Sequence, residues 1–427
     1  MKKIIISIGV IFLLMSTVFG IKYFLFSGEP KVVVAELDEP TWRTDIQITN
    51  ESYISYVDKY SIIRDTDSLG GGAAKYYSKY IDYISPNGKA IRLLAQDQVT
   101  DSQVLYAYSV LAFYLNNLDE DVANQMADNE AVLILPNGTH RETKMSIGAM
   151  LGHELYQNEI SNVGSNWYIE NDYEYRDASL EEIFHLVHDT GIGTSQNEQA
   201  NPELAQLIAS ATLNALPTNQ SDWGESGLWG LGSVDWLEEL KVEGSLEQEY
   251  FVSVLDSYYG LWEAWTESDG GMWGLYVAKS REEIEEKDPV GYEMITSFLP
   301  EYINVFMPVD EAFIGTFDMN YNDSTPYTAK SQYLQNLILQ GENDINILGN
   351  DQDNIFMGNS GVNIIDGGKG YNIIQLRGSF AQYVIMKNDD ETITVEDEIE
   401  GRDGKLILEN IQMLRFIDKD FAVSELE

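Results

Sequence analysis

Three consecutive nine-residue frames decide how the C-terminal part of this chain folds: residues 349–357 (GNDQDNIFM), 358–366 (GNSGVNIID) and 367–375 (GGKGYNIIQ). Each frame begins with glycine, has asparagine at its sixth position and carries an apolar residue at its eighth position. A repeat of fixed period predicts a parallel β-solenoid, in which each frame forms one turn and the eighth side chain points inward. The asparagines are Asn354, Asn363 and Asn372, and the apolar residues are Phe356, Ile365 and Ile374.

This pattern resembles the GGxGxDxUx repeat of repeats-in-toxin (RTX) proteins, in which turn carbonyls and the sixth-position aspartate hold calcium between coils. The resemblance covers residues 339–427, including the tail YVIMKNDDETITVEDEIEGRDGKLILENIQMLRFID. It implies a short parallel β-roll over residues 339–376 and a small β-rich cap over residues 377–427. Strands are expected at 381–386, 392–396 and 405–408, separated by polar turns.

The sixth-position asparagines leave two interpretations of the roll open. An amide oxygen can ligate calcium but brings no charge, and only the last frame keeps all three glycines. Neighbouring aspartates could restore some charge, so the first interpretation is a weak calcium site. The second is a metal-free solenoid held by an asparagine ladder. The candidate calcium residues are Asp351, Asp353, Asn354, Asn363, Asp366 and Asn372.

Residues 32–300 show no internal repeat and predict one mostly helical domain, followed by a connector over residues 301–338. Helices are expected at 101–118, 201–216, 247–262 and 280–298. Asn201 is the expected N-cap of the second helix, with Pro202 at its first position. The last helix should break at Asp288-Pro289, because proline cannot continue a helix.

The composition limits the functions that the chain can have. Its 427 residues suffice for at least two domains, and 44% hydrophobic residues provide a packed interior. The net charge of -44 disfavours binding to nucleic acid and to anionic lipid, and suits divalent cations or simple solubility. Since there is no cysteine, any metal must bind to histidine, carboxylate, amide or carbonyl groups.

The N-terminus predicts export. Lys2 and Lys3 precede an apolar run over residues 4–20, as in a signal peptide. Interrupted only by Lys22, the run continues to Phe26 and reaches the roughly 20 residues that span a bilayer. Residues 1–26 are therefore a signal peptide or, as we favour, an uncleaved anchor that holds the body at the cell envelope or outside it. This segment is the only expected contact with a membrane.

The four histidines lie close together in the sequence, and one segment, SLEEIFHLVHDTGI at residues 179–192, combines two of them with a helical pattern. Glu181-Glu182-x-x-His185 has the spacing of the zinc-protease motif HExxH, with glutamate in place of the first histidine. Residues four apart on a helix can bind one cation, and the residue after the first ligand can act as general base. Glu181 and His185 would then be ligands and Glu182 the base. Alternatively, Ser179 and Glu182 form a helix capping box, and Glu181 and His185 are a surface pair.

The later segment Glu249–Asp256 (EYFVSVLD) is similar to the third-ligand helix of lethal-factor-like zincin metallopeptidases, and DPVGYEMITSFLP resembles their closing helix. The resemblance implies a zincin-like, mainly α (α+β) body with zinc or another divalent metal. Because Ser253 occupies the expected ligand position, Glu249 or Asp256 would have to supply the third ligand. One imidazole fewer than usual suits a harder ion than zinc, or an inactive site.

Two further segments contain the remaining histidines. His153-Glu154 is a second partial HExxH match, for which a buried or capping role is the default interpretation, and His140 follows an Asn137-Gly138-Thr139 turn that also fits a glycosylation triplet. Walker loops, dinucleotide fingerprints and Gly-x-Ser-x-Gly elbows do not occur. The sequence therefore predicts an exported calcium-binding protein with a degenerate metallopeptidase-like domain that acts on peptides. The alternative is a non-catalytic, calcium-stabilised module that binds a peptide or a surface polymer.

Overall fold

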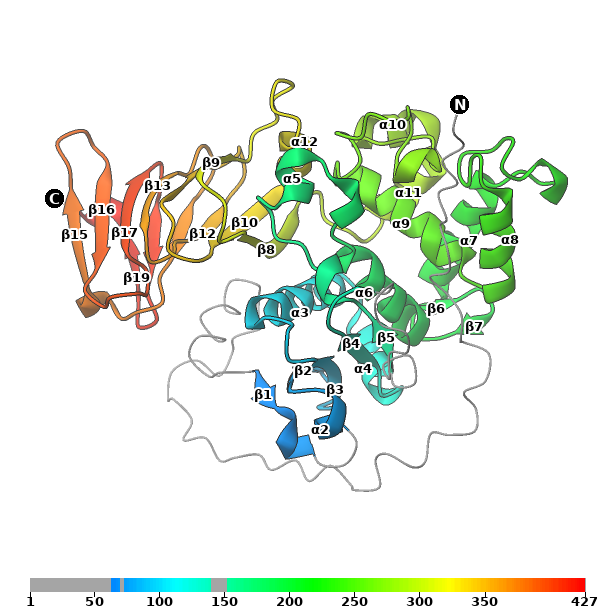
Figure 1. Cartoon of the computed structure of the whole chain (residues 1–427), viewed down its shortest axis with the longest axis horizontal. Coiled ribbons are helices and arrows are strands. Elements are labelled where there is room, and N and C mark those ends of the chain that lie inside the picture. Colours follow the sequence, from blue (N-terminus) through cyan, green and yellow to red (C-terminus); the bar gives the residue numbers. More distant parts are fainter. Residues whose placement is uncertain (1–62, 70–72, 140–151, 427) are drawn as a thin grey trace.

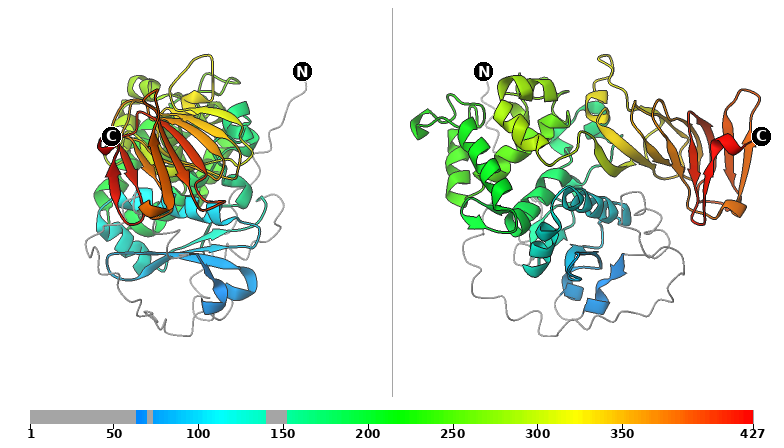
Figure 2. Two further views of the ribbon diagram at one scale, coloured as in Figure 1. Left: turned by 90° about the vertical axis from the view of Figure 1, so that its left-hand side faces the viewer. Right: turned by 180° about the vertical axis from the view of Figure 1, so that it is seen from behind.

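A computed structural model describes residues 63–69, 73–139 and 152–426, and it has a mixed α+β fold. A body of helices and one small sheet fills most of the molecule, and a two-sheet β-roll extends to one side of it (Figure 1). The view from behind shows the same elongated arrangement (Figure 2). The expected N-terminal signal or anchor and His140 lie outside the described residues. Within those residues, no helix is both long and apolar enough to cross a bilayer.

The N-terminal part of the body is a five-stranded sheet, which the sequence analysis did not predict. Two of its strands have only two residues, and the other three are too short for periodicity to distinguish a strand from a buried helix. They follow one another in chain order, with β3, β4 and β5 parallel. The strands are β1 (Arg64–Asp65), β2 (Lys79–Ile84), β3 (Ala90–Ala95), β4 (Val132–Leu135) and β5 (His153–Glu154).

The expected helices are present in the rest of the body. Asn201 caps its helix by accepting a hydrogen bond from the Leu204 amide, with Pro202 next, and the chain breaks between two helices at Asp288. The body helices are α2 (Ala73–Tyr76), α3 (Asp101–Asn116), α4 (Glu120–Asp128), α5 (Asn166–Glu170), α6 (Ser179–Val187), α7 (Pro202–Ala215), α8 (Val234–Glu243), α9 (Leu246–Tyr258), α10 (Arg281–Lys287) and α11 (Pro289–Thr296). A short hairpin, β6 (Gly193–Thr194) and β7 (Asn197–Glu198), follows α6.

The roll consists of two six-stranded sheets, and successive strands alternate between them up to β14. One sheet has the order β19-β18-β14-β12-β10-β8 and the other β15-β16-β17-β13-β11-β9. The strands are β8 (Ile303–Val309), β9 (Gly315–Asp318), β10 (Leu334–Leu339), β11 (Ile345–Leu348), β12 (Ile355–Met357), β13 (Val362–Asp366), β14 (Ile373–Gln375), β15 (Tyr383–Lys387), β16 (Ile393–Asp397), β17 (Lys405–Glu409), β18 (Met413–Arg415) and β19 (Asp420–Ala422). The last strands pair antiparallel at the outer edges and form the expected cap.

The period of the roll differs from the expectation that each frame forms one turn. Ile355 pairs with Ile373 and Ile347 with Ile365, so partner positions lie 18 residues apart and one coil takes two frames. A nine-residue frame crosses only one of the two sheets. The inward direction of the eighth position is confirmed, because Phe356, Ile365 and Ile374 are fully buried.

The roll also begins earlier than expected. The supposed connector, residues 301–338, contains β8, β9 and most of β10, and β8 pairs in parallel with β10. These strands lack the Gly and Asn pattern of the repeats, so the period alone could not reveal them. The first coil is continuous with the body: α3 packs on β8, and Val163 bridges Val309.

One buried lysine lies where the body meets this first coil. Lys330, on α12 (Thr328–Ser331), is fully buried, and its ammonium donates a hydrogen bond to the Asn171 side-chain oxygen. It lies 5.8, 5.7 and 5.5 Å from the ring centres of Trp167, Tyr168 and Tyr173. Burial lowers the pKa of Lys330 to about 7.

Candidate functional site

Helix α6 carries the centre of the site. Its N-cap is Ala178, and Ser179 lies inside the helix, with its amide bonded to the Asp177 carboxylate. The capping-box interpretation of Ser179 and Glu182 is therefore wrong. The helix continues into a π-helical turn at His188–Ile192, a local geometry that often marks functional sites.

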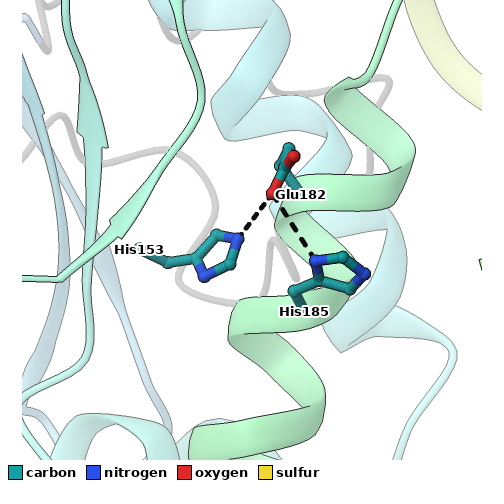
Figure 3. Close-up of side chains that lie close together, drawn as sticks. All are labelled: His153, Glu182 and His185. Carbon is teal, nitrogen blue, oxygen red and sulfur yellow. Dashed lines mark hydrogen bonds and ion pairs between the residues drawn. The ribbon is translucent and has the colours of Figure 1, made fainter. Parts of the chain in front are cut away.

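The Glu182 carboxylate lies between two imidazoles (Figure 3). Its Oε2 is 2.7 Å from Nε2 of His153 and 3.5 Å from Nδ1 of His185. His153 comes from β5, which pairs with β4 beside α6. One ligand atom from each of the three residues can be chosen so that all lie within 4.8 Å of one another. We call these three residues the histidine–glutamate group.

A second group shares His185. Glu181, His185 and Glu249 also offer ligand atoms within 4.8 Å of one another, and all three residues are buried. The Nε2 atom of His185 lies 3.7 Å from Oε1 of Glu249, on α9. The structure thus brings together three of the four residues that the EExxH interpretation assigned to a metal. We call them the acidic group.

Asp256 is in neither group. Its Oδ2 accepts a hydrogen bond of 3.1 Å from Trp262 and lies 3.7 Å from Arg176 Nη1. Arg176 also donates a hydrogen bond to Oε2 of Glu181. Arg176 could not be predicted as a site residue because no motif includes it. This guanidinium supplies a positive charge beside the acidic group.

Burial and neighbouring charges set the protonation of the site. Burial alone would raise the pKa of Glu182, but its bonds to His153 and His185 hold that pKa well below the usual range. Burial would lower the pKa of His185, yet the Glu182 bond and the Glu249 charge raise it to about 9. Burial raises the pKa of Glu249 to about 8, with His185 opposing the shift, and that of Asp256 to about 7, with Arg176 opposing it. Without a metal, the negative charge of the carboxylates is therefore balanced by the positive charges of His185 and Arg176 and by protons that the carboxyl groups retain.

Two further ionisable groups lie near the centre. Glu159 is mostly buried, and burial followed by the Glu182 charge raises its pKa to about 8. His188 is fully buried and stacks on Phe184, and burial lowers its pKa to about 3. Neither was assigned a role from the sequence.

The candidate calcium residues take part in hydrogen bonds and ion pairs within the roll. The three asparagines are fully buried, and their amides donate to oxygens of neighbouring turns: Asn354 to Gln335, Asn363 to Ile345 and Asn372 to Asn410. Asp351 and Asp353 lie between strands, and Asp366 is the last residue of β13. Asp351 pairs with Lys369 at 2.6 Å, Asp353 accepts from the Tyr371 amide at 2.6 Å, and Asp366 accepts from Asn410 at 2.7 Å. These contacts support the asparagine-ladder interpretation.

No protein-family profile matches this chain, and no curated protein is significantly similar to it. The geometry of the two groups therefore carries the functional argument.

Proposed function

We propose that the body is a metal-dependent hydrolase whose divalent ion is held by His153, Glu182 and His185. The single observation that carries the proposal is the position of the Glu182 carboxylate, 2.7 Å from one imidazole nitrogen and 3.5 Å from another. Ligand atoms around one tetrahedral zinc ion lie about 3.3 Å apart, given metal–ligand distances of about 2.0–2.1 Å. Two histidines and one carboxylate form a donor set typical of catalytic zinc.

This proposal changes the roles assigned from the motif. Glu182 becomes a ligand instead of the general base, and His153 replaces Glu181. The change follows from Arg176, which already binds Glu181, and from the two imidazoles, which suit zinc better than two carboxylates do. Zinc or manganese bound there would polarise a substrate carbonyl and lower the pKa of a bound water.

The surrounding residues support such a centre by orienting its ligands. Oε1 of Glu249 lies 3.7 Å from Nε2 of His185, across the ring from Nδ1, which lies 3.5 Å from Glu182. A carboxylate on the far nitrogen of a ligating histidine fixes the tautomer and orients the ring. The zincin resemblance of residues 32–300 supports a peptide as the substrate. The expected N-terminal signal or anchor supports action in the cell envelope or outside the cell.

The test is metal analysis and hydrolysis with the full chain. After incubation with zinc or manganese and exhaustive dialysis, we expect one ion per chain and chelator-sensitive cleavage of fluorescently labelled casein. His153→Ala, Glu182→Gln and His185→Ala should each lose the ion and the activity. The control Glu238→Gln, an exposed position on α8, should keep both. A wild-type chain without stoichiometric metal would overturn the proposal.

A calcium-stabilised binding module remains the second candidate function. The observation that favours it is that the repeats carry three aspartates, Asp351, Asp353 and Asp366. Calcium alone in the metal analysis, without casein cleavage, would support this function over the hydrolase.

A further inference from the structure

We propose that Arg176 fills a second cation position beside the metal centre, so that the site holds one divalent ion while this guanidinium is present. This inference rests on the proposed function, because it concerns the stoichiometry of the same site. Its basis is that His185 belongs to two potential metal-binding groups, one at each ring nitrogen.

The acidic group has the donors of a second ion site. Glu181, His185 and Glu249 offer two carboxylates and one imidazole nitrogen, all buried and within 4.8 Å of one another. Carboxylates suit manganese and an imidazole suits zinc, so this mixed set offers donors to either ion. Two buried carboxylates also need a positive charge nearby, because an unpaired buried charge is strongly unfavourable.

Arg176 supplies that positive charge in place of an ion. It donates to Oε2 of Glu181, and its Nη1 lies 3.7 Å from Asp256. Its side chain is only 12% exposed. Because the guanidinium bonds Oε2 of Glu181, its positive charge beside this carboxylate opposes the binding of a second cation to the acidic group.

The surroundings keep Arg176 in this position. The ring centre of Trp273 lies 5.1 Å from the guanidinium carbon. The ring centre of Trp262 lies 4.9 Å from that of Trp273, and Trp262 Nε1 donates a hydrogen bond to Asp256. Met272 and Trp273 both adopt left-handed backbone conformations, with φ of 49° and 54°. Such conformations are unfavourable for residues other than glycine and are retained where surrounding contacts enforce them. The guanidinium is thus enclosed between two carboxylates and an indole ring.

Zinc stoichiometry of the full chain tests this inference, measured by native mass spectrometry and elemental analysis after dialysis. We expect one zinc ion in the wild type and two in Arg176→Gln, whose amide can still bond Glu181 but brings no charge. Arg176→Lys should keep one ion, since it retains the charge. Arg176→Gln combined with Glu181→Gln should also hold one, because the second site then lacks a ligand.

Arg281→Gln is the matched control, since Arg281 is similarly buried, at 11% side-chain exposure, and stacks on Tyr258 away from the site. It should hold one ion. One ion in both the wild type and Arg176→Gln would overturn this inference alone, whereas no ion in the wild type would overturn the proposed metal centre. Two ions in the wild type would show that Arg176 does not exclude the second. An Arg176→Gln chain that stays unfolded in millimolar zinc would also overturn the inference, because an ion should replace the lost charge.

Discussion

The Nε2 atom of His185 lies 3.7 Å from Oε1 of Glu249, although the two residues come from different helices, α6 and α9. If Glu249 orients His185 as a metal ligand, Glu249→Gln should weaken zinc binding about 10- to 100-fold, as loss of such carboxylates does elsewhere. Competition with a chromogenic chelator measures this change. The variant Glu238→Gln, at an exposed position on α8, is the control. Equal zinc affinities in the two variants would show that Glu249 does not contribute to zinc binding.

Lys330 should make the stability of the protein depend on pH. Its pKa is about 7 in the folded chain and about 10.4 when unfolded. Between these values the unfolded state binds more protons, so this group makes the free energy of unfolding rise with pH. The slope from one such group approaches about 1.4 kcal/mol per pH unit.

Lys330→Met should remove this contribution and stabilise the chain at pH 7, where the wild type buries a partly charged ammonium. Urea unfolding at several pH values measures the difference between the variant and the wild type, so that other titrating groups cancel. Lys89→Met, whose side chain is 61% exposed, should show the wild-type dependence. The prediction would be contradicted if the free energy of unfolding of Lys330→Met changed with pH as steeply as that of the wild type.

Neighbouring residues on β13 should differ sharply in their effect on stability. Ile365 is fully buried in the roll, whereas Ile364 is 48% exposed on the outer face. Ile365→Ala should cost about 2–5 kcal/mol, because it leaves a cavity in the core. Ile364→Ala should stay within about 0.5 kcal/mol of the wild type. Denaturant unfolding compares the two, and similar costs would mean that the strand register is different.

Calcium should raise the melting temperature of the roll if Asp351, Asp353 and Asp366 bind the ion. A ligand at hundredfold excess over its dissociation constant adds about 2.7 kcal/mol to the stability of the folded state. Calorimetry of the full chain in millimolar calcium and in chelator tests this expectation. Coinciding transitions would leave the asparagine ladder as the support of the coils.

Asn363→Asp sharpens the calcium test. Its amide donates to the Ile345 carbonyl and to Asn359 Oδ1, so a carboxylate there would face two acceptors. We expect a lower melting temperature in chelator and a larger gain from calcium than in the wild type. A variant with the same calcium response as the wild type would exclude this position as a ligand.

The parts of the fold that depend on local patterns were predictable. Asn201-Pro202 marked the start of α7, Asp288-Pro289 marked a helix break, and the inward eighth positions followed from the repeat. Pairings between distant segments were not predictable, because nothing local encodes them. Thus the repeat could not reveal the two-sheet path of the roll, in which nine residues form half of a coil and not a whole turn.

In the candidate site, too, the features that depend on local patterns were predictable and the contacts between distant segments were not. The helical spacing of Glu181 and His185 indicated a shared face, and the helix α9 motif brought Glu249 to it. The approach of His153 to Glu182 could not be predicted, because it depends on β5 joining the sheet. Arg176 gave no signal, since a lone arginine in a loop has no characteristic pattern.

The two-frame coil limits how the length of the roll can change. Adding or removing one frame of nine residues would shift every later strand into the opposite sheet. The cap strands β17 and β18, which pair with β13 and β14, would then meet the wrong partners. Natural variants of this roll should therefore differ in length by multiples of 18 residues, each adding one strand of about 4.8 Å to both sheets.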